Sequence, residues 1–399
     1  MKPVKFLLLI IFGVFAMRHS FAQTWTQTGA PTNLWNCIAS SADGTKLLAV
    51  CESGSGLLGC VYTSPDGGIT WVSNNVPATN WSACASSADG TMLVAAANGG
   101  VIYTSTNSGT VWTQSTNPPA LSWNSIASSA DGTKLAAVGG GAPWPIYLST
   151  NSGVTWKNAT VAPSQDWNPV TMSADGTKLA SGMQAFGTGP IHFSTNSGAN
   201  WFTNGSPVDN TWRTFASSAD GSTLICAAGY ANPDGIYVST NFAATWAHTN
   251  FPGPNSVACS ADGKTLLVGV TPGLGSGGHI YLSTNSGAAW MTTDAPITNS
   301  WQSVACSADG KKLVAVVRGG GIWTAQMTPA PQINVSPPVV NVPLSWLVPS
   351  TNFVLQSSVD LSAWTDVTNQ PVLNLTNLQD EVSLPLSASN AFFRLSTSP

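Results

Sequence analysis

The stretch Ser41-Ala42-Asp43-Gly44 occurs once near the start of the chain and returns six more times. Its aspartates lie 42 to 47 residues apart, and they are Asp43, Asp89, Asp131, Asp175, Asp220, Asp262 and Asp309. A fixed period of this length is typical of supersecondary units that stack on one another. The sequence therefore predicts a repeat protein in which each copy marks the same position of one unit.

The third copy shows what one unit contains. Residues 123–129 suit a strand, and Asp131-Gly132 is the kind of dipeptide that closes a hairpin. Further strands are expected at 134–138, 145–149 and 155–159. Four short strands per unit describe one blade of a β-propeller. We therefore predict an all-β chain in which residues 23–327 form a seven-bladed β-propeller.

The strand count also predicts how the ring closes. The seventh copy ends at Gly321-Ile322-Trp323 and has no fourth strand after it. An unassigned strand, 24–28 with Trp25 in it, precedes the first copy. We expect this N-terminal strand to complete the last blade, since closure hides sheet edges that would template aggregation.

The turn between the third and fourth strands carries a motif, Ser64-Pro65-Asp66-Gly67-Gly68-Ile69-Thr70-Trp71. It resembles the Asp-box, or BNR repeat, whose pattern is Ser-x-Asp-x-Gly-x-Thr-Trp. Five later copies replace the aspartate with Asn107, Asn151, Asn196, Asn241 and Asn285. The resemblance covers residues 23 to about 327 and implies membership of the Asp-box propellers, which include sialidases, some glucan hydrolases, sortilin-type receptors and photosystem II assembly-factor-like proteins.

In that group the Asp-box is a fold-stabilising turn away from the active face, so the resemblance implies a structural role for Asp66. We give the seven Asp-Gly aspartates the same interpretation. A ring of calcium sites is the alternative. Calcium usually needs several convergent oxygen ligands, whereas each turn offers one carboxylate. We expect no metal site and no cofactor.

The first 22 residues have the pattern of an export signal. Lys2 and Lys5 precede an apolar run at 6–17, and Ser20-Phe21-Ala22 supplies small residues for cleavage after Ala22. The alternative is an uncleaved anchor. We expect cleavage, no membrane insertion afterwards, and a monomeric protein that is secreted, periplasmic or on a bacterial cell surface.

The charge balance excludes one class of partner. Without Lys2, Lys5 and Arg18, 10 basic side chains face 17 acidic ones. The chain has no basic stretch that could neutralise phosphates, so we expect no nucleic-acid binding.

The cysteines suggest one disulfide. Cys51 and Cys60 flank a glycine-rich turn and could face each other across a hairpin. The other five are expected to be buried small hydrophobic residues, and no cysteine or histidine spacing suggests zinc.

Composition changes at Thr328. A Pro-rich linker is predicted at 328–343, and short alternating strands in 344–399 suggest a small β-sandwich. Leu355-Gln356-Ser357-Ser358, Trp364-Thr365 and Phe392-Phe393-Arg394-Leu395 resemble a terminal module common in exported proteins of Verrucomicrobia-like bacteria. That resemblance implies a surface or export context and no chemistry.

A catalytic site is difficult to assemble from this sequence. A sialidase-like site would need an arginine cluster and a Tyr/Glu pair, but the propeller region has only Arg213, Arg318 and Glu52 of those charged types. A glycosidase with two carboxylates is an alternative. Its weak candidates are the acids outside the repeated turns, all on the face opposite the Asp-boxes: Glu52, Asp166, Asp209, Asp234 and Asp294. Solvated loop charge is the other interpretation.

Six tryptophans open the first strands at the same face: Trp35, Trp81, Trp123, Trp167, Trp212 and Trp301. An exposed ring of indoles could stack on sugars or hold apolar side chains of a partner. The alternative is that each indole wedges between blades with its N–H on a backbone carbonyl. We predict a non-catalytic binding scaffold whose ligand, a glycan or an extracellular protein, meets this loop-rich face, with these tryptophans as contact candidates. The alternative function is a glycoside hydrolase that uses two of the loop carboxylates.

Overall fold

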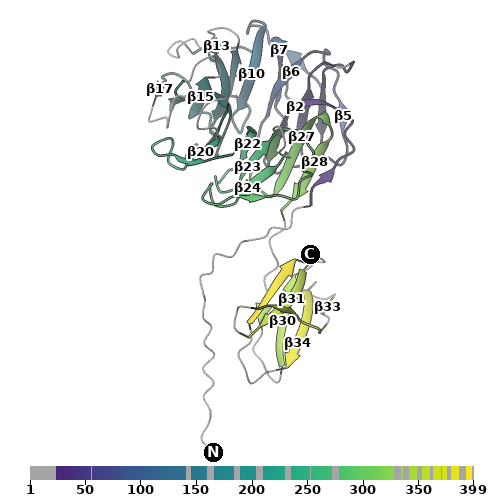
Figure 1. The fold of residues 1–399 in the computed structure, drawn as a ribbon. Coiled ribbons are helices and arrows are strands. Elements are labelled where there is room, and N and C mark those ends of the chain that lie inside the picture. The colour runs from purple at the N-terminus through teal and green to yellow at the C-terminus, as the bar shows by residue number, and fades with distance from the viewer. Residues whose placement is uncertain are drawn as a thin grey trace, which may run out of the picture. The chain divides into compact units, whose positions relative to one another are not determined.

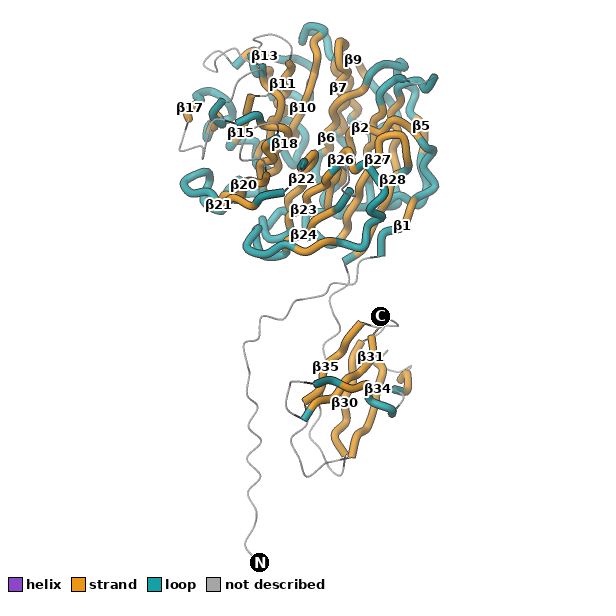
Figure 2. Tube along the Cα trace, in the orientation of Figure 1, coloured by secondary structure: helices purple, strands orange, loops and turns teal. Residues whose placement is uncertain are grey.

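A computed structural model describes most of the chain after residue 23. The described ranges are 24–54, 56–140, 145–159, 166–183, 189–203, 210–229, 235–251, 253–271, 278–327, 334–335, 341–347, 353–359, 363–369, 371–374, 379–385 and 392–397. Regular structure in them is entirely β, without a helix (Figure 2). Consequently these ranges contain no helix that could cross a membrane. The predicted signal at 1–22 lies outside them.

The chain divides into two compact units, one of which is Gln23–Met327 and the other of which contains Thr328–Pro399. In the larger unit each Asp-Gly turn joins the first and second strands of an antiparallel set (Figure 1). The complete sets in chain order are β2 (Asn33–Ser40), β3 (Leu47–Cys51), β4 (Cys60–Ser64) and β5 (Val72–Ser73); β6 (Trp81–Ser86), β7 (Leu93–Gly100), β8 (Ile102–Ser105) and β9 (Thr113–Gln114); β10 (Leu121–Ser128), β11 (Leu135–Gly140), β12 (Tyr147–Ser149) and β13 (Lys157–Asn158); β14 (Trp167–Met172), β15 (Leu179–Met183), β16 (His192–Ser194) and β17 (Phe202–Thr203); β18 (Trp212–Ser217), β19 (Leu224–Ala228), β20 (Gly235–Ser239) and β21 (Ala247–Thr249); and β22 (Pro254–Cys259), β23 (Leu266–Val270), β24 (Ile280–Ser283) and β25 (Met291–Thr292).

The remaining set joins the two ends of the repeat region. It contains β26 (Trp301–Cys306), β27 (Lys312–Gly320) and β28 (Ile322–Gln326), and its outer strand is β1 (Thr26–Gln27). Thr26 pairs with Thr324 and Gln27 with Trp323, while the amide of Thr28 donates to the carbonyl of Ile322 at 2.8 Å. The predicted closing strand is therefore confirmed.

The Asp-Gly turns are stabilised from within. At the first turn the Ser41 hydroxyl donates to Asp43 at 2.6 Å, and the Thr45 amide donates to the same carboxylate at 2.9 Å. Gly44 has a φ of 67°, which an L residue rarely adopts. A side chain there would also meet Lys312 of the preceding set within 3 Å. The motif thus needs glycine both for the turn and for close contact between sets.

The alanine of each Ser-Ala-Asp-Gly turn links its set to the next through the backbone. The amide of Ala42 donates to the carbonyl of Ala88 at 2.7 Å, and the pattern continues around until Ala308 donates to Ala42 at 2.7 Å. The complete cycle, which we call the backbone ring, is Ala42, Ala88, Ala130, Ala174, Ala219, Ala261 and Ala308. The repeated motif therefore closes a circle at one end of the first strands of the larger unit.

The core lies between neighbouring sets. One cluster joins Leu48 and Val50 of β3 to Trp81 of β6 and Leu93 of β7. Another joins Trp35 of β2 to residues of β27 and β28 across the junction of the chain's two ends. Second strands are buried on both faces, as in β3, where every residue is buried. Such faces can only be covered by stacked sheets, which produces the propeller arrangement.

The C-terminal unit contains two antiparallel sheets. One has β29 (Asn334–Val335), β30 (Asn341–Leu347), β33 (Val372–Asn374) and β34 (Gln379–Pro385); the other has β31 (Phe353–Ser358), β32 (Thr365–Asp366) and β35 (Phe392–Thr397). Leu344 and Val382 of the first sheet share a hydrophobic cluster with Leu355 and Phe393 of the second.

Candidate functional site

The six first-strand tryptophans are packing residues, which corrects the prediction that they form an exposed ring. Each has a relative exposure of 0%, and they are Trp35, Trp81, Trp123, Trp167, Trp212 and Trp301. A fully buried indole offers no face to a ligand. Stacking the sets side by side covers the inner strands, and bulky side chains at these positions fill the space.

Each of these indoles packs on an aromatic ring of its own set's third strand. Trp81 meets Tyr103 edge-on with 5.6 Å between ring centroids, and Trp167 meets His192 at 5.1 Å. Three indole N–H groups donate to backbone carbonyls, as Trp212 does to Gly189 at 2.9 Å. Edge-to-face pairs of this kind add to the energy of burial. Burial between sets therefore describes all six residues. The carbonyl bond of the wedge interpretation holds for Trp35, Trp123 and Trp212, whereas the buried indole N–H groups of the other three have no hydrogen-bond partner.

The residue after each of these positions is polar and bonds to the next set. Such side chains donate to backbone carbonyls of the next set, at 2.6–3.3 Å. The pairs, donor first, are Asn36 to Trp81, Ser82 to Trp123, Asn124 to Trp167, Asn168 to Trp212, Arg213 to Pro254, and Asn255 to Trp301. Gln302 then donates to the side chain of Asn36 at 3.0 Å. We call this cycle the side-chain ring. It lies at the opposite end of the first strands from the backbone ring.

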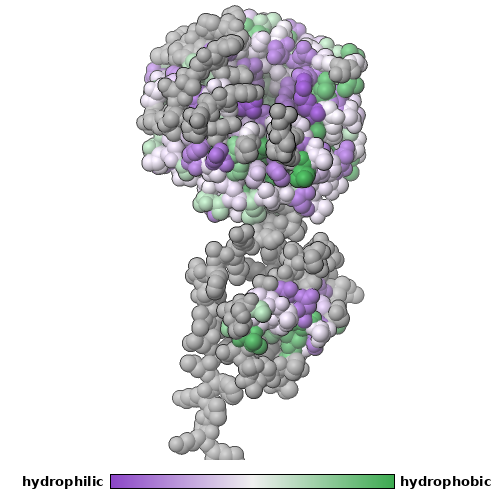
Figure 3. Space-filling view, viewed as in Figure 1, coloured by the Kyte–Doolittle hydropathy of each residue, from purple (hydrophilic) through white to green (hydrophobic). Residues whose placement is uncertain are grey.

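A pocket of about 330 Å³ opens on this face. Its lining residues come from β2, β6, β7 and β27 and from the segments beside them: Leu34, Asn36, Glu52, Ser53, Gly54, Asn80, Ser82, Asn98 and Arg318. Hydrophilic residues gather over β2, β6 and β7 in the space-filling view (Figure 3). We call this cavity the amide pocket, because three of its lining residues are the asparagines Asn36, Asn80 and Asn98.

The charges in the amide pocket neutralise each other. Arg318 of β27 forms an ion pair with Glu52, and its Nε donates to Glu52 at 2.6 Å. Asn80 accepts from the Ser53 amide at 3.0 Å, while Asn98 is exposed at the end of β7. The pocket is thus a neutral surface rich in hydrogen-bond donors and acceptors.

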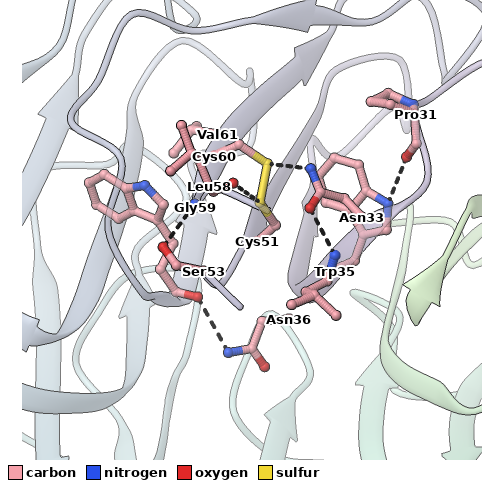
Figure 4. The surroundings of a disulfide bond; sticks show 12 residues. Pro31, Asn33, Trp35, Asn36, Cys51, Ser53, Leu58, Gly59, Cys60 and Val61 are labelled. Carbon is pink, nitrogen blue, oxygen red and sulfur yellow. Dashed lines mark hydrogen bonds between the residues drawn. A yellow bond between two sulfur atoms is a disulfide. The ribbon is translucent and has the colours of Figure 1, made fainter. Parts of the chain in front are cut away.

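A hairpin held by a disulfide supports one wall of the pocket (Figure 4). Cys51 and Cys60 are bonded, with 5.1 Å between their Cα atoms. The Ser53 hydroxyl accepts from the Gly59 amide at 2.9 Å, and Asn36 projects beside this loop. The cross-link therefore restrains the segment that carries Glu52, Ser53 and Gly54.

The structure does not assemble the suggested carboxylate pair within its described part. Glu52 is the one acid in the amide pocket and is ion-paired. Asp166 precedes β14, and Asp294 is exposed with a pKa raised by desolvation. Asp209 and Asp234 lie outside the described residues. No cluster of three or more metal-binding side chains occurs in the described ranges.

The turn aspartates accept hydrogen bonds from their own turns. Hydrogen bonds from the serine hydroxyl first, and then from the following backbone amide, lower the pKa of Asp43 to about 2. The same causes lower the pKa of Asp89, Asp175 and Asp220 to about 2. Asp131, Asp262 and Asp309 also have lowered pKa values and accept the same serine bond. Their oxygens are engaged locally, as the structural interpretation requires.

The Asp66 turn is built in the same way. The Thr70 amide and hydroxyl donate to Asp66 at 2.8 and 2.6 Å, and the Ser64 hydroxyl accepts from the Gly68 amide at 2.8 Å. In a later repeat Asn151 stands at the position of Asp66, and its side-chain oxygen accepts the equivalent hydrogen bond from the Thr155 amide at 2.9 Å. An Asn side chain offers the same acceptor oxygen, so the repeat tolerates the exchange.

Sequence reasoning missed the asparagines of the pocket. Asn36 could have been noticed because a polar residue follows the tryptophan in six repeats and follows Pro254 in the other. Asn98 carries no such signal, since it follows a run of alanines and lies in the pocket only because β7 extends to Gly100.

No family model matches the chain, and no match is found among curated proteins. Solved structures do match. "YCF48 bound to D1 peptide" has a TM-score of 0.56 at 14% identity, with 77% of this chain and 97% of that one covered. A GH74 xyloglucanase from Xanthomonas campestris has a TM-score of 0.61 at 15% identity, covering 82% of this chain and 60% of that one. The Swd1 β-propeller domain of Myceliophteria thermophila has a TM-score of 0.57 at 11% identity, covering 76% and 100%. Together with the curled antiparallel sets, these similarities show that the chain has a β-propeller fold.

Proposed function

We propose that the protein is an exported, non-catalytic scaffold whose propeller binds a peptide segment of another exported protein in the amide pocket. The propeller in this proposal has seven blades, as the repeat count and the closed backbone ring support, and its turns are of the Asp-box type. The C-terminal unit is proposed to be a small β-sandwich on a linker. The observation that carries the function is the neutral, asparagine-lined pocket on the face opposite the Asp-boxes.

A peptide main chain suits this pocket. Each residue of an extended peptide offers one N–H and one C=O, and each asparagine side chain offers both a donor and an acceptor. Asn98 is exposed, so its amide is accessible to such a ligand. The Glu52–Arg318 ion pair leaves no net charge to attract a phosphate. The similar structure titled "YCF48 bound to D1 peptide" supports peptide binding by a propeller of this fold.

A glycan is less well supported. Sugar rings bind by stacking on exposed aromatic faces as well as by hydrogen bonds. The indoles nearest this face are fully buried, and no aromatic residue lines the amide pocket. A glycan in this pocket could therefore form hydrogen bonds but would have no aromatic ring to stack on.

The hydrolase alternative also has less support. Retaining and inverting glycosidases place two carboxyl groups about 5 to 10 Å apart. The pocket contains the single carboxylate of Glu52, and its ion pair with Arg318 disfavours the protonated form that a general acid needs.

The test is a binding screen with a matched pair of variants. The wild-type protein would be screened against a displayed library of random peptides and against a glycan array. Asn98→Ala removes an exposed pocket amide, and Asn200→Ala removes an exposed amide on an Asp-box turn. The proposal predicts peptide hits whose affinity falls at least about tenfold in Asn98→Ala, the loss of one or two ligand hydrogen bonds, and is unchanged in Asn200→Ala. Glycan hits alone, or equal affinities of both variants, would refute it.

Export is proposed from the sequence alone, and it has its own test. Expressed with its first 22 residues in a bacterial host, the protein should be recovered outside the cytoplasm with Gln23 as its first residue. A cytoplasmic product that keeps Met1 would refute export without touching the binding proposal.

A further inference from the structure

At four junctions, neighbouring sets are linked by one more hydrogen bond, made by the residue two positions after the first residue of the tryptophan-type strand start, at Cys37, Ser125, Ser256 and Ser303. In three junctions a serine hydroxyl accepts from the backbone amide of the next set: Ser125 from Val170 at 3.2 Å, Ser256 from Val304 at 3.0 Å and Ser303 from Ile38 at 3.3 Å. At the junction of β2 and β6 the acceptor is the sulfur of Cys37, which the Cys84 amide approaches at 3.3 Å. A thiol thus replaces a hydroxyl at this one point, and its neighbour is another cysteine.

The two cysteines contact each other directly. Cys37 Sγ lies 3.6 Å from the carbonyl oxygen of Cys84, and the Cys84 amide nitrogen lies 3.3 Å from Cys37 Sγ. Because an amide nitrogen is about 1.5 Å from its Cα, Cys37 Sγ is within about 5 Å of Cys84 Cα, close enough for a disulfide with little backbone movement. Cys37 is partly exposed, and Cys84 is buried.

The environments of the two thiols differ in a useful way. The pKa of Cys37 is lowered, first by the hydrogen bond from the Cys84 thiol and then by backbone and serine donors, although burial opposes this. Desolvation raises the pKa of Cys84 well above its usual value. The thiolate is the reactive form, so Cys37 is the nucleophile of the pair and Cys84 the thiol that resolves it.

We propose that Cys37 and Cys84 are a redox-active pair that a peroxide converts into a second disulfide, which ties β2 to β6. The two strands also carry Asn36 and Ser82 of the amide pocket, so the cross-link would join residues one and two positions along the chain from its lining. This inference does not depend on what the pocket binds.

The reaction balances with hydrogen peroxide as the oxidant. The Cys37 thiolate attacks one peroxide oxygen, the O–O bond breaks, and hydroxide leaves, which gives a sulfenic acid on Cys37. The Cys84 sulfur then attacks the Cys37 sulfur, the S–O bond breaks, and water leaves. The Cys84 proton leaves in this water, and the proton that Cys37 lost on forming its thiolate neutralises the hydroxide of the first step. Two thiols and one peroxide thus become one disulfide and two waters.

The chain contains an internal control pair. Cys259 and Cys306 end the first strands of adjacent sets, yet the Cys259 sulfur contacts the carbonyl of its neighbour Ser260 at 3.3 Å. Desolvation raises the pKa of both thiols. Neither thiol has the activation that Cys37 has, so this pair should stay reduced under the same treatment.

Trypsin digestion distinguishes the two possible disulfides, because the two cysteines of each pair lie on different tryptic peptides. Cys37 is on the peptide that ends at Lys46, and Cys84 is on 47–134 together with Cys51 and Cys60. Cys259 is on 214–264, and Cys306 is on 265–311. Folded protein would be treated briefly with peroxide, blocked with iodoacetamide, digested without reductant and analysed by mass spectrometry. We expect the peptide that ends at Lys46 to be linked to peptide 47–134. The number of free thiols should fall from five to three.

Two conservative variants keep the test interpretable. Cys37→Ser copies Ser125, Ser256 and Ser303, and Cys84→Val copies Val170, Val257 and Val304, so both should fold. Cys37→Ser should abolish the link, and Cys84→Val should leave a sulfenic acid on Cys37 that dimedone traps. The proposal is overturned if wild-type protein keeps all five thiols, if 214–264 links to 265–311 as readily, or if the link forms only after unfolding.

Discussion

Gln302 Nε2 donates a hydrogen bond to Asn36 Oδ1 at 3.0 Å, across a sequence separation of 266 residues. It is the last link of the side-chain ring, and it joins the last repeat to the first. Ala308 and Ala42 make the corresponding link of the backbone ring at 2.7 Å. Two cycles, one at each end of the first strands, therefore hold the repeats in a closed circle.

Breaking the side-chain ring at this link should have a measurable effect. Gln302→Ala removes this bond and the one that its side chain accepts from Asn255 at 3.3 Å, so it is expected to lower the free energy of unfolding by about 1–2 kcal/mol. Asn36→Ala also removes two bonds and should cost a similar amount. In urea denaturation the double variant should be less destabilised than the sum of the two, because both lose the shared bond. Gln326→Ala, an exposed glutamine, is the control, and additive losses would contradict the ring.

The burial of Trp81 predicts that its loss affects stability first. Trp81→Ala should lower the free energy of unfolding by about 3–5 kcal/mol, since it empties a core position beside Tyr103. Val111→Ala, at a side chain that is 59% exposed, should change it by less than about 0.5 kcal/mol. A Trp81→Ala protein with an unchanged melting temperature would contradict the packing role.

The turn carboxylates predict acid sensitivity. The pKa of Asp89 is lowered to about 2 from its ordinary value of 3.8, so its ionised form is favoured by folding. The resulting stability is complete above the unfolded value and is lost as pH falls through about 4 toward 2. Asp89→Asn should therefore lower the urea midpoint at pH 7, and the difference from wild type should shrink at pH 2.

Asp294 supplies a control of opposite sign. Desolvation raises its pKa, so its contribution is lost as pH rises through the folded value. Asp294→Asn should leave the midpoint at pH 7 unchanged or slightly higher. A constant difference between Asp89→Asn and wild type at all pH values would show that the Asp89 charge is unimportant.

The N-terminal strand predicts a truncation phenotype. A chain that starts at Gly29 loses β1 and the buried indole of Trp25, and it exposes the edge of β28. Unpaired edges promote association. We expect a lower urea midpoint and larger species in size-exclusion chromatography. A monomer with an unchanged midpoint would show that β1 does not close the ring.

The fold could be predicted because its determinants are local and repeated. Asp43 and Gly44 define a turn by their own hydrogen bonds and dihedral preference, and Trp25 stood out because one fourth strand was missing. Multiplied over the repeats, these short-range signals specified strand order and ring closure without any knowledge of packing.

The site could not be predicted in the same way. Trp81 at a strand end suits either an exposed platform or a buried wedge, and only the stacking of β3 against β6 decides between them. The sequence alone suggests a solvated loop acid at Glu52. Its ion-pair partner Arg318 is 266 residues away in the chain and lies beside it only because the fold joins the last repeat to the first. Asn98 enters the pocket through the length of β7, which no turn signal specifies.

Hydrogen exchange of the protein, measured with and without a peptide from the library screen, locates the bound peptide on the propeller. If the peptide lies in the amide pocket, exchange slows on binding in the segments that line it, at 34–36, 52–54, 80–82 and 98, and is unchanged in the turns between third and fourth strands, such as 64–71. Protection confined to those turns, or to the C-terminal unit, would show that the peptide does not bind in the amide pocket.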